Sequence, residues 1–118
     1  MSDCIFCKLV LDKKGYAAET ATLFAVFDLH PVSKGHAMII PKRHIESNFD
    51  LNEQESKETT EILKKLKAII DQKYSPKGYN IGSNNGKAAG QFVMHFHIHV
   101  IPRYKEGPGL HALGEYEK

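Results

Sequence analysis

Three histidines occupy alternate positions near the C-terminal end of the sequence, namely His95, His97 and His99. Apolar residues separate and follow them, and a period of two in such a context is typical of a β-strand. Because successive side chains of a strand point to opposite faces, we expect the three imidazoles to share one face. Imidazole exchanges protons, binds metals and acts as a nucleophile near neutral pH. The segment therefore predicts a catalytic or metal-binding site.

The spacing leaves two chemistries open, a metal cage and a nucleophilic imidazole. Zinc sites of three histidines usually draw ligands from more than one strand. Neighbouring positions on one face of a strand are about 6.6–6.8 Å apart, so His95 and His99 would have difficulty reaching one ion. A nucleophile oriented by its neighbours fits this geometry better. The preceding loop, residues 84–91, is rich in glycine and amide side chains, which favour close approach of a phosphate or ribose.

A second chemical motif lies at the start of the sequence, where Cys4 and Cys7 form a Cys-x-x-Cys pair. In a reducing compartment such a pair favours a metal site or a redox couple over a structural disulfide. A redox pair of the thioredoxin kind follows a strand and opens a helix, whereas this pair precedes the first predicted strand. The first residues also lack the basic and apolar regions of a signal peptide, which predicts a cytoplasmic location.

Composition limits the class of protein. The 118 residues are 42% hydrophobic and 25% charged, which predicts one globular domain over residues 1–118, with a Gly- and Pro-containing tail over 103–118. The net charge of +2 is too small, and the basic residues too scattered, to indicate a nucleic-acid partner. No apolar run is long enough to predict a membrane span.

The elements that must position these residues can be predicted from periodicity and turn signals. Strands are expected over 22–28, 36–40 and 79–83, in addition to the histidine strand. Asp50 and Glu53 resemble a capping box that opens a helix reaching about Tyr74. Short connections favour antiparallel neighbours. These elements predict an α+β fold. The exposed edges of its sheet favour edge-to-edge pairing in a homodimer.

Two blocks of this sequence resemble the histidine triad (HIT) family of nucleotide hydrolases and transferases. One block runs from Gly90 and Gln91 through the three histidines to Arg103. The other runs from Phe27 and Asp28 through Gly35 to His44, so the resemblance covers most of the chain. It implies a HIT-like fold, in which an antiparallel meander of about five strands packs against one long helix and two sheets join edge to edge in a homodimer.

The resemblance also implies roles for individual residues. His97 would be the nucleophile that attacks the α-phosphorus of a nucleotide and forms a covalent nucleotidyl-histidine, His99 would contact the phosphate, and His36 would orient the nucleophile. Asp28 would accept hydrogen bonds from the ribose, and a simple cap of the turn before Pro31 is the alternative explanation of this residue. The remaining substrate contacts implied are the base-walling residues Leu29, Phe6 and Phe27, and the ribose or phosphate contacts Asn84 and Gln91.

The implied activity is hydrolysis of a purine nucleotide that carries a substituent on its α-phosphate, such as a nucleoside phosphoramidate or a dinucleoside polyphosphate. Nucleotidyl transfer is an alternative, but transferase branches resembling this family usually have glutamine in place of the third histidine, whereas this chain has His99. A nucleotide-binding sensor or adaptor with little turnover is another. The chain departs from the pattern at Phe92, where many members have a serine or threonine that assists the leaving group.

The chain resembles in particular the bacterial-type members of the HIT family that have an N-terminal Cys-x-x-Cys, and those bind zinc through both cysteines and two histidines. The matching positions here are Cys4, Cys7, His44 and His95. Such a Cys₂His₂ set would be closed and structural, and it would leave only His97 and His99 facing the phosphate. The alternative is a pair of free thiols with His44 on the surface. His30 and His111 are expected to be exposed and without a role.

Overall fold

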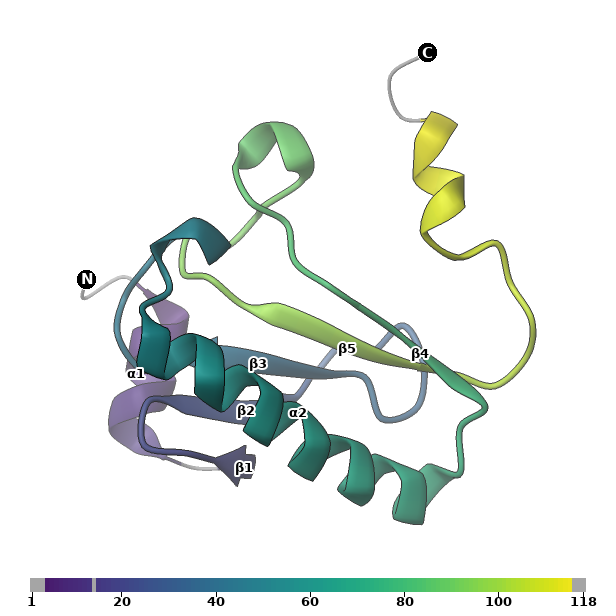
Figure 1. Cartoon of the computed structure of the whole chain (residues 1–118), viewed down its shortest axis with the longest axis horizontal. Helices are drawn as coiled ribbons and strands as arrows, with labels where there is room; N and C mark the ends of the chain where they lie inside the picture. Colours follow the sequence, from purple (N-terminus) through teal and green to yellow (C-terminus); the bar gives the residue numbers. More distant parts are fainter. Residues whose placement is uncertain (1–3, 14, 116–118) are drawn as a thin grey trace.

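A computed structural model describes residues 4–13 and 15–115 of the chain. Its centre is an open sheet of five antiparallel strands in the order β1-β2-β3-β5-β4 (Figure 1). The order departs from a simple meander in one place, because β5 lies between β3 and β4. The strands are β1 (Tyr16–Glu19), β2 (Leu23–Phe27), β3 (Ala37–Pro41), β4 (Gly78–Gly82) and β5 (Ile98–Arg103).

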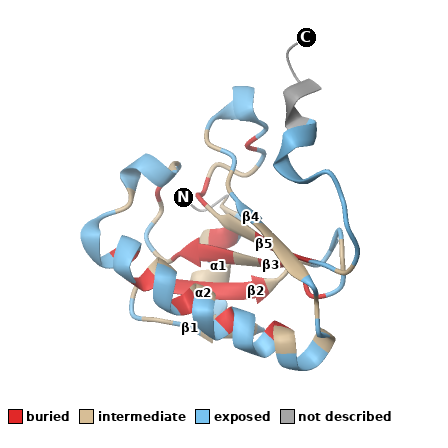
Figure 2. Ribbon diagram, turned by 45° about the vertical axis from the view of Figure 1, so that its right-hand side comes forward, coloured by how far each residue is buried: buried red, intermediate tan, exposed pale blue. Residues whose placement is uncertain are grey.

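The long helix α2 (Glu53–Tyr74) covers one face of this sheet (Figure 1). Three of its residues at four-residue spacing, Ile62, Leu66 and Ile70, are fully buried, while the rest of the helix surface is largely exposed (Figure 2). They pack on alternate residues of the strands, including Leu23, Ala25, Ala37, Ile39 and Val100. One apolar stripe on the helix and one face of the sheet thus form the main core.

The opposite face carries the N-terminal helix α1 (Ile5–Asp12), which lies behind the sheet in Figure 1. Phe6 of this helix is buried with Phe24, Val26 and Ile40, the strand residues whose side chains point away from α2. His99 belongs to this second face, because it pairs in register with Met38, which packs on the same cluster. The candidate histidines and cysteines are therefore expected on the face of the sheet opposite α2.

The start of α2 differs from the prediction. The capping box is formed by Asn52 and Glu55, whose side chains each bond the backbone of the other, and not by Asp50 and Glu53. Residues Asn48–Asp50 instead form a separate 3₁₀ turn capped by Ser47. Both pairs have the same spacing, but Leu51 and Asn52 are extended and so separate the turn from the helix.

The histidine segment also differs from the expectation of one long strand. β5 begins at Ile98, so only His99 lies on the strand, while His95 and His97 belong to the bend before it. Their three side chains therefore do not line one face of a strand. Each imidazole has different hydrogen-bond partners. The other three predicted strands lie within one residue of the observed β2, β3 and β4.

Beyond β5 the described residues finish with a 3₁₀ segment, Gly109–Glu115, which stands apart from the sheet (Figure 1). The last three residues of the tail predicted over 103–118 lie outside the described range. Among the described residues, no helix has both the length and the apolar composition that crossing a membrane requires.

Candidate active site

The bend before β5 fixes which nitrogen of His97 carries a proton. Nδ1 of His97 lies 2.9 Å from the backbone carbonyl oxygen of His95. A carbonyl oxygen only accepts hydrogen bonds, so Nδ1 is the protonated nitrogen and Nε2 of the neutral ring keeps its lone pair. The ring of Phe6 packs edge-on against His97, with centroids 5.1 Å apart. His97 is thus held in one tautomer with an unprotonated nitrogen available for attack.

His36 and His99 form a hydrogen-bonded chain next to this ring. The backbone N–H of Val32 donates to Nδ1 of His36 over 3.2 Å. His36 must then carry its proton on Nε2, which donates to Nδ1 of His99 over 2.9 Å. His99 in turn carries its proton on Nε2. The centroids of the His97 and His99 rings are 5.0 Å apart, so the ring with the Nε2–H donor is the neighbour of the ring with the Nε2 lone pair.

Burial keeps both of these histidines neutral. It lowers the pKa of His36, although the nearby carboxylate of Asp28 acts in the opposite direction. Burial also lowers the pKa of His99, to about 4, with the neighbouring imidazoles of His97 and His36 adding to the shift. Both rings therefore act as neutral hydrogen-bond donors at neutral pH in the absence of substrate.

Asp28, His36 and His99 also have potential ligand atoms within 4.8 Å of one another. A ligating nitrogen must be unprotonated, whereas the Val32 amide keeps the proton of His36 on Nε2, the atom that faces the other two side chains. Metal binding there would cost His36 its backbone hydrogen bond. The three residues are accordingly a proton-bearing chain rather than a good metal site.

Cys4, Cys7, His44 and His95 form a different cluster, whose ligand atoms also lie within 4.8 Å of one another. Nδ1 of His95 lies 3.2 Å from Sγ of Cys4 and 3.5 Å from Sγ of Cys7, and Nδ1 of His44 lies 3.2 Å from Sγ of Cys7. Tetrahedral zinc holds sulfur and nitrogen ligands about 3.5 Å from each other. His95 is fully buried and donates from Nε2 to the Pro41 carbonyl oxygen over 2.7 Å, which leaves Nδ1 free to ligate. Donor types, spacing and tautomer all fit a zinc ion.

Helix α1 explains how the two cysteines come together. Cys4 is its N-cap and accepts the backbone N–H of Cys7, so the pair does open a helix, which the sequence had not predicted. It follows no strand among the described residues, and both thiols face histidines. This environment supports a metal site over a thioredoxin-like redox pair.

Comparison with known proteins agrees with this geometry. The family model described as HIT domain matches residues 13–106. A Schizosaccharomyces pombe protein named adenosine 5'-monophosphoramidase is 41% identical over 112 residues, covering 91% of this chain and 79% of the relative. The chain belongs to the HIT family. Among solved structures, a HIT family protein from Bacillus anthracis is 37% identical with a TM-score of 0.81, covering 88% of this chain and 75% of the other.

A zinc-bound histidine triad protein from Mycobacterium smegmatis is also similar, with 28% identity and a TM-score of 0.78 over 88% of this chain and 77% of the other. Together with the HIT membership, these relatives support nucleotide hydrolysis as the general class of activity. The zinc-bound neighbour agrees with the donor set of Cys4, Cys7, His44 and His95, which could hold a metal ion.

The residues expected to contact substrate in this HIT protein do not all lie on the face of the sheet opposite α2, where His99 lies. Asp28 has one carboxylate oxygen 3.6 Å from Nε2 of His36 and the other accepting the backbone N–H of His30, so it also caps the turn. Leu29 is exposed beside it, and Phe6 packs on His97. His30 and His111 are exposed, as predicted.

Phe27 does not lie beside Phe6, where the sequence analysis expected it to wall the base. It packs on the α2 side of the sheet, with the Lys73 ammonium 5.8 Å from its ring centroid. Side chains alternate along β2, so it is Val26 that shares a face with Phe6. The alternation counted back from Asp28 could have identified Val26 from the sequence.

The loop before the histidines holds Gln91 differently from the expectation of a phosphate contact. Its side chain is buried, its amide nitrogen donates to the carbonyl oxygens of Glu46 and Val93, and its oxygen accepts the N–H of Gly86. Gln91 thus closes the loop. Asn84 is exposed, with one long hydrogen bond of 3.5 Å to Gly90, and the neighbouring Phe92 is 95% exposed.

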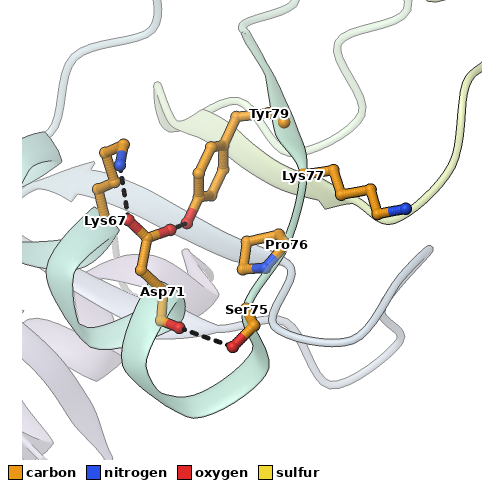
Figure 3. A pocket seen from close by; sticks show the side chains of 7 residues that line it. Lys67, Asp71, Ser75, Pro76, Lys77 and Tyr79 are labelled. Carbon is orange, nitrogen blue, oxygen red and sulfur yellow. Dashed lines mark hydrogen bonds and ion pairs between the residues drawn. The ribbon is translucent and has the colours of Figure 1, made fainter.

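A hollow between the end of α2 and β4 lies apart from the histidines (Figure 3). Its polar groups bind one another, because Asp71 accepts hydrogen bonds from Lys67 (2.6 Å) and from the Tyr79 hydroxyl (2.5 Å). Burial raises the pKa of the Tyr79 hydroxyl, and the hydrogen bond to Asp71 is the second largest cause of this increase. The hollow joins α2 to β4 and offers no reactive group.

Proposed function

We propose that this protein hydrolyses purine nucleotides that carry a substituent on the α-phosphate, with nucleoside phosphoramidates as the first candidates. The observation that carries the proposal is the His97 ring, whose Nδ1 is engaged by a backbone carbonyl and whose Nε2 keeps its lone pair. Its centroid lies 5.0 Å from that of His99, the ring that carries its proton on Nε2. A nucleophile and a hydrogen-bond donor side by side are what in-line substitution at phosphorus requires.

The proposed reaction has two steps. Nε2 of His97 attacks the α-phosphorus, and the bond from phosphorus to the amine or phosphate leaving group breaks as a nucleotidyl-histidine forms. Water then attacks the same phosphorus, which releases the nucleoside monophosphate and restores His97. Nε2–H of His99 stabilises the charge that develops on the phosphate oxygens in both steps. His36 holds His99 in the tautomer that makes this donation possible.

The nucleotide is held on the face of the sheet opposite α2. Asp28 accepts from the ribose hydroxyls with the carboxylate oxygen that does not cap the turn. Phe6 and Leu29 contact the base together with Val26, and the exposed amide of Asn84 contacts ribose or phosphate. These base contacts are apolar and discriminate bases weakly. The adenosine 5'-monophosphoramidase named among the relatives is the support for a purine.

The leaving group meets Phe92 rather than a hydroxyl. The amide of Gln91 is committed to the loop backbone, so it does not replace the hydroxyl. We therefore propose that water protonates the amine nitrogen as the phosphorus–nitrogen bond breaks, whereas a phosphate leaving group departs as an anion. A panel of phosphoramidates and dinucleoside polyphosphates, compared by kcat/KM, identifies the preferred leaving group.

Zinc is the proposed occupant of Cys4, Cys7, His44 and His95. The closed Cys₂His₂ set supplies a structural cross-link between α1, the segment after β3 and the histidine bend, and ligand binding adds to the free energy of folding. Reduced thiols at such a site agree with a cytoplasmic location. The measurement is the metal content of protein purified at neutral pH without chelator; near-zero zinc contradicts the assignment.

A homodimer joined through strand β4 completes the proposal. β1 and β4 are the edges of the sheet. β1 carries a register irregularity between Tyr16 and Ala18, a feature that discourages further pairing. β4 pairs with β5 in unbroken register and has the uncharged sequence Gly-Tyr-Asn-Ile-Gly, so it is the edge better suited to a second copy.

The deciding experiment replaces the proposed nucleophile and measures hydrolysis of adenosine 5'-phosphoramidate. His97→Ala should lower kcat by about 10³-fold or more, while His111→Ala, a change of an exposed histidine in the tail, serves as the matched control. Mass spectrometry of wild-type protein quenched during turnover should detect one added adenylyl group. Unchanged turnover in His97→Ala contradicts the nucleophile assignment, and a wild type without turnover on either substrate class favours a nucleotide sensor.

A further inference from the structure

The candidate metal centre and the proposed nucleophile share a residue. His95 faces Cys4 and Cys7 with Nδ1, donates from Nε2 to the Pro41 carbonyl oxygen, and accepts the Nδ1–H of His97 with its own carbonyl oxygen. The same residue therefore contacts the thiols through its side chain and fixes the tautomer of His97 through its backbone. Any shift of His95 changes the hydrogen bond on which the lone pair of His97 depends.

A second contact joins the same two places. Phe6 lies between the two cysteines in the sequence, is 4% exposed, and packs edge-on against both His95 and His97, with centroid distances of 5.8 and 5.1 Å. The ring therefore fills the space beside the nucleophile. Its own position is set by the first turn of α1, whose N-cap is Cys4.

The cysteine pair is the link between that turn and the histidine bend. The rest of α1 contacts the sheet through apolar packing of Leu9 and Val10 and one hydrogen bond from the Tyr16 hydroxyl to the Leu9 carbonyl. Apolar packing has little directional preference, whereas ligand bonds to one ion fix both distance and angle.

We propose that Cys4, Cys7, His44 and His95, joined by a bound metal ion, position His97 for attack through the His95 carbonyl and the Phe6 ring. The catalytic consequence rests on the proposed function, but the tautomer consequence does not. Neither Cys4, Cys7 nor His44 touches the phosphate in this arrangement; all three are positioning residues. Metal occupancy then controls turnover as well as stability.

The direct test observes the His97 ring without turnover. Two-bond ¹H–¹⁵N correlation spectra report which imidazole nitrogen is protonated, and His97→Gln assigns the signals. At a fixed pH well above the ordinary imidazole pKa, the Zn²⁺-loaded protein should show His97 only as the Nδ1–H tautomer. The reduced, chelator-treated protein should show a mixture with Nε2–H. A pure Nδ1–H signature in the metal-free protein would overturn the proposal.

The kinetic test separates positioning from general loss of stability. His44→Ala should lower kcat for adenosine 5'-phosphoramidate about 10- to 100-fold. His44→Cys, which supplies another zinc ligand but no imidazole, should recover most of that rate when loaded with Zn²⁺. Leu66→Val, in the core beneath α2, is the control for destabilisation, with all rates measured well below each variant's Tm.

The kinetic and spectroscopic tests can contradict the two proposals separately. Equal kcat in His44→Ala and wild type, or no recovery in Zn²⁺-loaded His44→Cys, overturns the positioning role. A wild type that does not hydrolyse the phosphoramidate overturns the proposed function instead, and the spectra still decide whether the metal sets the tautomer of His97.

Discussion

Backbone groups decide the protonation pattern of the histidine cluster. The carbonyl oxygens of His95 and Pro41 and the amide of Val32 each engage one imidazole nitrogen. A backbone group has a fixed role as donor or acceptor, so it selects one tautomer without depending on pH. Rings of the same chemical type thereby differ in which nitrogen carries a lone pair, as the proposed roles of nucleophile, donor and metal ligand require.

This pattern leads to a prediction at His36. His36→Ala leaves Nδ1 of His99 without its donor, so kcat should fall about 10- to 100-fold with little change in KM, since an unpaired buried polar atom costs roughly 1–3 kcal/mol. His36→Gln places an amide N–H near the same position and should retain more activity. Steady-state kinetics on adenosine 5'-phosphoramidate provide the measurement, and equal losses in the two variants would contradict the orienting role.

The residue types of the site could be predicted from the sequence, but their partners could not. The alternating histidines, the Cys-x-x-Cys pair and their resemblance to the HIT family predicted the clusters that the structure brings together. At β2, alternation from Asp28 predicts that Val26 shares its face and that Phe27 lies on the opposite one, as the structure shows. The roles of the His95 and Pro41 carbonyls have no signal in the sequence, because every residue has a carbonyl.

At the scale of elements, two buried carboxylates hold α2 against the sheet. Glu55 accepts two hydrogen bonds from the Arg43 guanidinium, at 2.8 and 3.1 Å. Glu58 accepts the backbone N–H and hydroxyl of Thr22, at 2.8 and 2.9 Å, at the entry to β2. The contact of Arg43 with Glu55 fixes the segment that carries His44.

Glu58 gives a pH dependence that can be measured. Hydrogen bonds from Thr20, Thr22 and Gln54 lower its pKa to about 2 from an ordinary value of 4.5. The folded state thus favours the carboxylate, whose stabilisation is complete above pH 4.5 and is lost as the pH falls towards 2. Glu58→Gln should lower the Tm at neutral pH, and its difference from wild type should shrink below pH 4.5. A Tm difference independent of pH would contradict this assignment.

The turn before β3 predicts a second effect at this scale. Gly35 has a φ of +86°, and a Cβ there would lie 2.9 Å from Cδ2 of Tyr74 on α2. Gly35→Ala should therefore lower the free energy of unfolding by at least about 1–2 kcal/mol, and displace the adjacent His36. Gly15→Ala has a similar positive φ of +72° without any contact within 4 Å, and so isolates the backbone cost. Denaturant unfolding of both variants compares them, and equal losses would contradict the steric argument.

Element prediction succeeded where one face of an element is apolar. The stripe of α2 and the alternation of β2 and β3 have this property. Helix α1 is only eight residues long and β1 only four, which is too short for a periodic signal. The bend that delays the start of the histidine strand to Ile98 depends on contacts far along the chain, such as the bond from the Phe96 amide to the Ile45 carbonyl.

At the scale of the whole molecule, the two faces of the sheet have separate tasks. α2 and the apolar residues beneath it form the core, while the opposite face carries the histidines and the Cys–His cluster. Because the core does not include the cluster, removing zinc should lower the Tm without abolishing the fold. Thermal unfolding with and without chelator, followed by Zn²⁺ addition, measures this, and an unchanged Tm would contradict a structural role for the metal.

The edges of the sheet decide how two copies would meet. Ile81 on β4 is 44% exposed, and its strand is uncharged. A charged side chain on an edge strand opposes pairing with a second copy. Ile81→Lys should therefore shift the protein from dimer to monomer in analytical ultracentrifugation, while Leu11→Lys, at an 86% exposed position on α1, should leave the dimer intact. A dimer that persists in Ile81→Lys but dissociates in Leu11→Lys would place the interface on the α1 side instead.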